Sequence, residues 1–498
     1  MAKEISPTGP EEVPSKVVKI EDVDDALVFL GQQNARAPTP EDEKKLIKKI
    51  DKRIVPLMFV CYTLQYLDKT LLNYAAVMGL KEDTGISGDQ YSLLSTIFYI
   101  SFLFFEIPGG YVLQRVPTAK YLSVNVLLWG VVVAAMAGAH DWPSLVVLRV
   151  LLGIFEAIIG PALLRITTMW YKRAEQPLRV GFWYMGIGSG TIIGSLSSYG
   201  FQFYEGKSFK SWQIMFLTFG LITSLVGFLV YVIMPDNPMT AKFLTDEEKV
   251  WAIERLRANR TGVENRTFKV SQVWDCLTDP QVWMIALIKI FSSIPNGAVS
   301  SYQAQIIKSF GYTSKETALL SVASGGILIV SILASSWAAG RFNAVGPATI
   351  VLHLLGGVLG GGLTAFSPKN NKSLQLAGNY FMNISISTMS LQYSYAANNI
   401  AGHTKKAMMS AILLMSFCIG NIIGPLTFRD QDAPNYLPAK ISVMTAASLA
   451  ILMNATLLVY YWWQNKRRDR LSESLEYQED REFLNLTDRE NPEFRYRY

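Results

Sequence analysis

The segment SLVVLRVLLGIFEAIIGPALL, residues 144–164, is almost wholly apolar, yet it holds two ionisable side chains, Arg149 and Glu156. A helix of about twenty apolar residues is long enough to cross the hydrocarbon core of a bilayer, which is about 30 Å thick. Blocks of the same kind recur along the 498 residues, of which only 17% are charged, whereas soluble domains carry about 25%. These features predict a protein that spans a membrane many times.

The apolar blocks fall into two sets of six, with a polar linker between them. The first set covers residues 54–79, 91–115, 118–138, 143–170, 179–203 and 212–234. The second set covers residues 281–307, 315–340, 346–366, 373–397, 406–427 and 438–463. We therefore predict an all-α membrane protein with 12 transmembrane helices in two six-helix halves. Its predicted parts are a tail over 1–53, a half over 54–234, a linker over 235–280, a half over 281–463 and a tail over 464–498.

The linker contains one recognisable helix start. Thr245 and Glu248 have the spacing of a capping box, and helical periodicity continues to about Arg257. We expect one short amphipathic helix that lies against the membrane surface.

Lys and Arg gather in the linker, in both tails and in every second loop, whereas the other loops carry mainly acidic residues. Because basic residues flank the cytoplasmic ends of membrane helices, we expect both termini and the linker to face the cytoplasm. The basic excess is spread over these loops, so we expect no nucleic-acid partner. The three cysteines do not indicate a disulfide framework.

The two halves share a glycine motif at corresponding places. The fifth predicted helix contains Gly190 and Gly194, and the eleventh contains Gly420 and Gly424. This spacing lets two helices approach closely, and its repetition indicates parallel structural repeats. The alternative is that glycine is common in membrane helices.

Ionisable residues inside the apolar blocks are the candidate functional groups, because each costs about 2.5–3.5 kcal/mol at the centre of a membrane helix. They are Asp68 and Lys69 in the first helix, Glu106 in the second, Arg149 and Glu156 in the fourth, and Lys289 in the seventh. Arg149 and Glu156 are seven residues apart, so they share one face of the helix about 10 Å apart. Adjacent Asp68 and Lys69 point about 100° apart, so at most one of them faces the cavity squarely.

These groups suggest how protons could be coupled to an anion. Burial favours the protonated form of a carboxyl group, and a nearby cation favours the ionised form. An anionic substrate that competes for Arg149 would therefore favour protonation of Glu156, and Asp68 beside Lys69 is a second such pair. Structural roles stay open. Arg149 could join helices, and Asp68 could be a structural partner of a basic residue in the cytoplasmic half. Glu106 could bond backbone freed by Pro108, and Lys289 could extend to the cytoplasmic surface.

Polar side chains at mid-depth in the second half could complete a substrate site. They are Asn296 in the seventh helix and Asn383, Gln392 and Tyr393 in the tenth. Interhelical hydrogen bonds are the alternative role for each of them.

Several motifs together resemble one known family. They are residues 66–73 (YLDKTLLN), 149–157 (RVLLGIFEA), 170–177 (WYKRAEQP), 399–406 (NIAGHTKK), 420–425 (GNIIGP) and the ending over 486–496. The chain resembles the anion:cation symporter branch of the major facilitator superfamily, and within it the fungal allantoate permease family, over roughly residues 45 to 498.

The resemblance implies proton-coupled uptake of small carboxylates, such as allantoate, ureido acids, small peptides or nicotinate, at the plasma membrane of a fungal cell. It implies proton-coupling roles for Asp68 and Glu156 and substrate contacts for Lys69 and Arg149. Many relatives have Arg where this chain has Lys69, so a point-charge contact replaces a bidentate one. Gln114 stands where the superfamily has an acidic residue in the loop after the second helix, which departs from the usual gating contact.

Three functions other than uptake are compatible with parts of this sequence. A proton-coupled exporter of drugs or metabolites shares this architecture, but such exporters usually have a proline among the helix-five glycines, and residues 186–200 contain none. A non-transporting nutrient sensor would normally have a longer soluble domain. An enzyme is disfavoured because the three histidines have no metal-ligand spacing and no nucleophile motif occurs. We expect a monomer without metal or cofactor, whose partners are an organic anion, protons and lipid.

Overall fold

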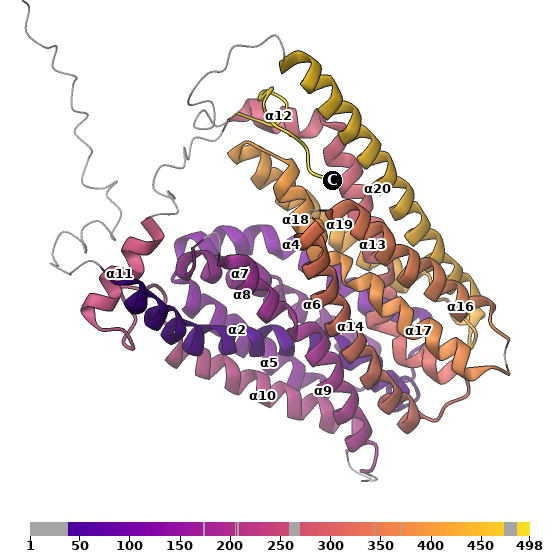
Figure 1. Ribbon diagram of the computed structural model, residues 1–498. Helices are drawn as coiled ribbons and strands as arrows, with labels where there is room; N and C mark the ends of the chain where they lie inside the picture. The colour runs from indigo at the N-terminus through magenta and orange to yellow at the C-terminus, as the bar shows by residue number, and fades with distance from the viewer. Residues whose placement is uncertain are drawn as a thin grey trace, which may run out of the picture.

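The computed structural model describes residues 38–172, 175–204, 206, 209–257, 269–342, 344–368, 370–472 and 486–498. The parts of the predicted tails and linker over 1–37, 258–268 and 473–485 lie outside these described residues. The described residues form helices and no strand, and Figure 1 shows the first and second halves of the chain as two bundles that lie side by side. The predicted all-α membrane fold is confirmed.

The bounds of the helices are as follows. The N-terminal half contains α2 (Pro40–Val77), α3 (Leu80–Thr84), α4 (Gly88–Arg115), α5 (Thr118–Met136), α6 (Trp142–Glu156), α7 (Ile159–Trp170), α8 (Gln176–Tyr184), α9 (Gly186–Phe201) and α10 (Ser211–Ile233). The linker contains α11 (Asp246–Arg257) and α12 (Val270–Thr278). The C-terminal half contains α13 (Pro280–Ser309), α14 (Ser314–Phe342), α15 (Val345–Leu352), the π-helix η3 (His353–Gly360), α16 (Gly361–Phe366), α17 (Lys372–Ile386), α18 (Thr388–Asn399), α19 (His403–Leu426), the 3₁₀ turn η4 (Asp430–Asp432) and α20 (Leu437–Ser472).

Nine helical segments of the described residues are long and apolar enough to cross a bilayer. The three remaining predicted spans are α2, α8 with α9, and α17 with α18. Their sequences are more polar: α2 carries Asp68 and Lys69, α9 is rich in Gly and Ser, and α17 and α18 hold several Asn, Ser and Thr side chains. These three spans therefore fall short in apolar character because they carry many polar side chains.

Several spans predicted as continuous are interrupted in the structure. The fourth is divided at Ala157 and Ile158 into α6 and α7. Pro161 explains this break, because it lacks the N–H that would bond the carbonyl of Ala157 and its ring crowds that carbonyl. The fifth span is divided at Met185, the tenth at Ser387, and the ninth contains η3. The break leaves Glu156 as the last residue of α6.

The glycine motifs occupy equivalent contacts in the two halves. A Cβ atom at Gly190 of α9 would lie 2.8 Å from the carbonyl oxygen of Thr63 in α2. At Gly420 of α19 it would lie 2.4 Å from the carbonyl oxygen of Ile290 in α13. Both glycines therefore let two helix backbones touch, and the predicted internal repeat is confirmed at these contacts.

Among the described residues, hydrogen bonds between the two halves gather at one end of the bundle, which we call the far end. Tyr91 of α4 donates to the carbonyl of Ser301 in α13 at 2.8 Å, and the Ala304 N–H donates to Asn73 of α2 at 3.1 Å. Lys81 of α3 donates to Gln305 at 2.8 Å. The halves are thus joined at the far end.

The opposite end, which we call the linker end, carries one linker helix on each half (Figure 1). The predicted capping box is present at α11, where Thr245 and Glu248 exchange hydrogen bonds. Lys49 of α2 and Glu248 form an ion pair at 2.6 Å. The second linker helix, α12, was not predicted from the sequence.

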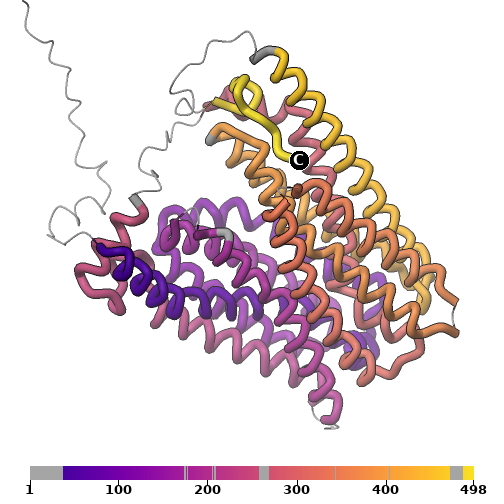
Figure 2. Tube along the Cα trace, viewed as in Figure 1, coloured from indigo at the N-terminus to yellow at the C-terminus, as the bar shows by residue number. Residues whose placement is uncertain are grey.

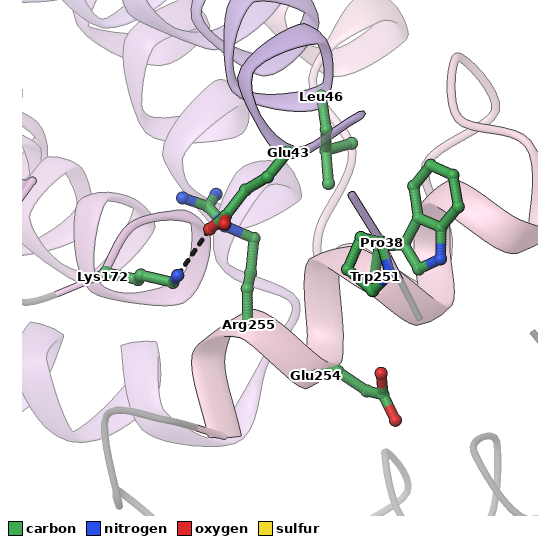
Figure 3. A pocket seen from close by; sticks show the side chains of 7 residues that line it. All are labelled: Pro38, Glu43, Leu46, Lys172, Trp251, Glu254 and Arg255. Atoms are coloured by element: carbon green, nitrogen blue, oxygen red, sulfur yellow. Dashed lines mark hydrogen bonds and ion pairs between the residues drawn. The ribbon is translucent and has the colours of Figure 1, made fainter. Parts of the chain in front are cut away.

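A surface pocket lies where α11 meets the N-terminal half. Trp251, Glu254 and Arg255 of α11 line it together with Glu43 and Lys172, and Figure 3 shows Lys172 paired with Glu43. The hydrogen bond from Lys172 holds the pKa of Glu43 below its usual value. Arg255 of α11 pairs with Glu175 at 2.5 Å and with Glu43 at 3.5 Å, so ion pairs hold this linker helix in place.

Residues 486–498 fold back against α12 and α20 on the C-terminal half (Figure 2). The ammonium of Lys405 lies 2.9 Å from Asp275, 2.7 Å from Asp279 and 2.9 Å from Asp488. Lys405, Asp279 and Asp488 are fully buried. We call these four residues the Lys405 cluster; it joins α12, α13, α19 and the last residues of the chain.

Candidate functional site

The ionisable residues of the first and fourth spans lie together inside the N-terminal half. Asp68, Arg149 and Glu156 are each at most 2% exposed, and Lys69 is partly exposed. Glu156 interacts electrostatically with Asp68, Arg149 and Lys69. We call these four residues the central charges. None of them forms a salt bridge with a described residue, unlike the Lys405 cluster.

The hydrogen bonding of the central charges is incomplete. One oxygen of Glu156 and two guanidinium nitrogens of Arg149, Nε and Nη2, are buried without a hydrogen-bond partner among the described residues. The other end of Glu156 is fixed, because Gln65 of α2 donates to its backbone carbonyl at 3.3 Å. Buried polar atoms without partners are rare in native proteins, and they point to a site that receives a ligand, water or a proton.

Adjacent Asp68 and Lys69 point to different neighbours, as their spacing predicts. Asp68 accepts a hydrogen bond from Thr223 of α10 at 3.2 Å. Lys69 instead extends toward the C-terminal half, where its ammonium lies 5.5 Å from the ring centre of Phe417 in α19. It is also 4.8 Å from the ring centre of Tyr99. Lys69 therefore carries a positive charge to the boundary between the halves.

Lys289 does not extend to the surface, so that alternative is wrong. Helix α13 begins at Pro280, which places Lys289 more than two turns inside, and its side chain is fully buried. The ammonium lies 3.3 Å from the sulfur of Met389 and 4.4 Å from the ring centre of Tyr393. It is also 5.5 Å from the ring centre of Phe417. Lys69 and Lys289, one from each half, thus meet at the same ring.

The rings around these lysines leave part of the interior accessible. Tyr393 is 39% exposed, and Tyr66 and Phe417 are partly exposed. Tyr393 interacts electrostatically with Tyr184 and Glu106 of the other half, so it faces the boundary between the halves. A small molecule that reached this boundary would meet aromatic faces and two ammonium groups.

The three amides predicted to bind substrate are engaged within the protein. Asn296 donates to Asn421 of α19 at 2.7 Å, and Asn383 donates to the carbonyl of Asn379 at 3.0 Å. Gln392 donates to Ser292 at 2.6 Å, and Ser292 bonds His353 at 2.7 Å. A contact between these amides and the substrate stays a prediction. The alternative role, an interhelical hydrogen bond, is observed for Asn296 and Gln392.

Glu106 does not bond the backbone near Pro108. It is 6% exposed, and both of its carboxylate oxygens lack a hydrogen-bond partner among the described residues. Its electrostatic neighbours include Tyr393 of α18 and Cys418 of α19. Glu106 therefore faces the other half.

Sequence reasoning missed Phe417, Cys418, Tyr99 and Thr223. Aromatic and small side chains are ordinary in membrane helices, so nothing in their spacing distinguishes them. Tyr66 lay within a motif that was noted, although it was given no role. The three cysteines are buried and not disulfide-bonded, in agreement with the prediction.

Comparison with known proteins defines the class. Residues 58–425 match the family model of the Major Facilitator Superfamily, and the chain belongs to this superfamily. It is therefore a multi-pass membrane transporter and not an enzyme.

Particular relatives narrow the comparison. The chain is 34% identical to the allantoate permease of Saccharomyces cerevisiae, with 99% of this chain and 92% of the permease covered. It is also 34% identical to the thiamine pathway transporter of the same yeast, with 98% and 96% covered. Among solved structures, the inward-open xylose transporter of E. coli matches with a TM-score of 0.63 and 15% identity, over 80% of this chain and 95% of that one. The last likeness concerns the fold alone.

Proposed function

We propose that this transporter is a proton-coupled symporter that takes up a small carboxylate by alternating access at the plasma membrane, with both termini in the cytoplasm. The observation that carries the proposal is the meeting of Lys69 and Lys289 at the ring of Phe417. The two lysines come from different halves, so one anion could contact both halves at once.

The chemistry of this pair favours an anion. Neither ammonium forms a salt bridge with a described residue, and a buried cation without a counter-ion is unfavourable. A carboxylate placed between the two would supply charge-assisted hydrogen bonds to both. Lysine acts as a point charge and imposes little angular requirement, whereas the faces of Tyr66 and Tyr393 suit a flat or apolar remainder of the solute.

The central charges support proton coupling. Burial and the neighbouring Asp68 disfavour the ionised form of Glu156, and the cations Arg149 and Lys69 partly offset this cost. An anion that draws Lys69 or Arg149 toward itself removes part of this stabilisation and favours protonation of Glu156. Asp68 is the second candidate acid. Substrate and proton would then bind together.

The relatives support a carboxylate without selecting one. Allantoate is the first candidate, because the allantoate permease aligns over nearly the whole chain. The thiamine pathway transporter and the high affinity cysteine transporter of Saccharomyces cerevisiae, the latter 27% identical over 99% of this chain and 92% of that one, call for a broader panel. The absence of proline in residues 186–200 supports uptake over export.

The test is uptake of labelled solutes by cells that express the protein. Allantoate, ureido acids, nicotinate, cysteine and dipeptides are compared with and without a proton-conducting uncoupler. We expect one carboxylate to accumulate and the uncoupler to abolish its accumulation. Release of the solute against its gradient from preloaded cells would instead support an exporter, and accumulation that the uncoupler leaves unchanged would contradict proton coupling.

The lysine pair is tested with the identified solute. We expect Lys69→Ala and Lys289→Ala each to raise KM at least about tenfold, the equivalent of about 1.4 kcal/mol. Lys440→Ala is the matched control, because Lys440 is also a buried lysine over an aromatic ring, 5.1 Å from the centre of Phe310. An unchanged KM in both site variants would contradict this site.

A further inference from the structure

Glu106 is a buried acid that the proposed mechanism does not use. It lies on α4, is 6% exposed, and neither carboxylate oxygen has a hydrogen-bond partner among the described residues. Its neighbours on the same helix, Phe105 and Ile107, are exposed. The side chain of Glu106 therefore points away from the surface that these two residues cover, and toward the C-terminal half.

The groups that face Glu106 provide no counter-ion. Its titratable neighbours on α18 and α19 are Tyr393 and Cys418. Lys69 of α2 and Lys289 of α13 interact with Cys418, whereas no described cation interacts with Glu106. At the following turn of α4, a Cβ atom at Gly109 would meet Ile158, in the break between α6 and α7, and the hydroxyl of Tyr121 on α5. Glu106 is thus surrounded by neutral groups.

This environment differs from that of the two buried acids among the central charges. Glu156 interacts with Arg149 and Lys69, and Asp68 interacts with Arg149 and accepts a hydrogen bond from Thr223. An isolated carboxylate in a low-dielectric interior is strongly disfavoured and takes up a proton instead. The protonated acid is neutral and tolerates the contact between α4 and the C-terminal half.

We infer that Glu106 is a second proton-carrying group, whose protonation depends on the contact between the two halves and not on the substrate. The inference rests on the proposed symport. A hydronium ion transfers its proton to one carboxylate oxygen of Glu106 while that oxygen is open to water, and the O–H bond persists while α4 packs against α19. When the halves move apart at this contact, water reaches the carboxyl group and the same O–H bond breaks, which returns the proton to water. Glu156 would carry the proton that responds to the anion, and Glu106 the proton that responds to the conformation.

The experiment measures coupling in proteoliposomes that hold the purified full chain, with the carboxylate identified above. At equilibrium, each coupled proton multiplies accumulation about tenfold per unit of pH gradient, because one pH unit and a tenfold concentration ratio are the same free energy. We expect Glu106→Gln, which fixes a neutral side chain, to lower accumulation about tenfold at a gradient of one unit while exchange of external for internal substrate continues. Glu106→Asp should restore the wild-type ratio, and Glu82→Gln, at an exposed acid of α3, should leave it unchanged.

Each outcome decides between the two proposals. An unchanged ratio in Glu106→Gln overturns the role of Glu106 and leaves symport intact, whereas a wild-type protein whose accumulation ignores the pH gradient overturns the proposed function itself. If Glu106→Gln does not exchange substrate, infrared spectroscopy of the purified proteins tests whether Glu106 is protonated. The wild type should show a protonated carboxyl band at neutral pH that Glu106→Gln lacks and Glu82→Gln keeps, and an identical band in all three overturns the inference.

Discussion

Two groups of buried ions in this molecule differ in how completely they are paired. In the Lys405 cluster, one ammonium lies within 2.9 Å of three carboxylates, and Arg489 and Gln281 add further bonds to Asp275 and Asp488. The central charges form no salt bridge with a described residue and leave nitrogens of Arg149 and an oxygen of Glu156 without partners. We call the Lys405 cluster saturated, because its cation is paired with three carboxylates, and the central charges unsaturated, because they form no such pair with a described residue. The saturated group holds elements together, and the unsaturated group is left open for a ligand and a proton.

The strongest way to break the saturated group is Lys405→Met. Removing the cation leaves three carboxylates close together, two of them fully buried, so we expect a loss of about 3–5 kcal/mol of folding stability. The measurement is the melting temperature and the yield of monodisperse protein in detergent. Lys45→Met, at an exposed lysine of α2, is the control. A melting temperature equal to the wild type would show that the cluster does not hold this end of the C-terminal half.

In the unsaturated group the matching change is Glu156→Gln, which should affect function and leave folding intact. The amide has nearly the same shape but cannot be ionised, so we expect proton-driven accumulation to be abolished while substrate exchange stays measurable. Uptake measured with a pH gradient reports proton-driven accumulation, and exchange measured without a pH gradient reports substrate binding and movement. Concentrative uptake at the wild-type level would remove Glu156 from the coupling role.

The smallest effect is expected where ions are half exposed, at the pair of Glu43 and Lys172. The hydrogen bond from Lys172 lowers the pKa of Glu43 from 4.5, so its contribution is present above the unfolded-state pKa and is lost as the pH falls through the lower folded-state value. About a third of each side chain is exposed, so we expect Glu43→Gln to cost under about 1 kcal/mol at pH 7. The melting temperatures of variant and wild type should converge in acid and in high salt. A difference that persists in acid would contradict this account.

The fold was predictable because the bilayer imposes one length on every span, and because Gly190 and Gly420 mark close helix contacts at equivalent places in the two halves. Burial of Asp68, Arg149 and Glu156 was also predictable, since charges that occur inside apolar spans seldom face lipid. The break at Ala157 follows from Pro161, although its consequence for Glu156 required the structure.

The rest of the site depends on which side chains of different helices meet. The surface alternative for Lys289 was wrong because it depended on a side-chain direction that spacing cannot give, whereas the predicted start of this span, residue 281, was within one residue of the start of α13. Phe417 was missed because an aromatic residue in an apolar helix is not unusual. The amides of Asn296 and Gln392 could be predicted to form interhelical hydrogen bonds. Their partners, Asn421 and Ser292, could not be predicted, because they lie on other helices.

The separate attachment of the two linker helices has a practical consequence. Helix α11 is tied to Lys49 and Glu175 of the N-terminal half, and α12 is tied to Lys405 of the C-terminal half. Each helix must then travel with its own half, so a pair of fluorescent dyes on α11 and α12 would report the separation of the halves during transport, with no label placed inside the membrane.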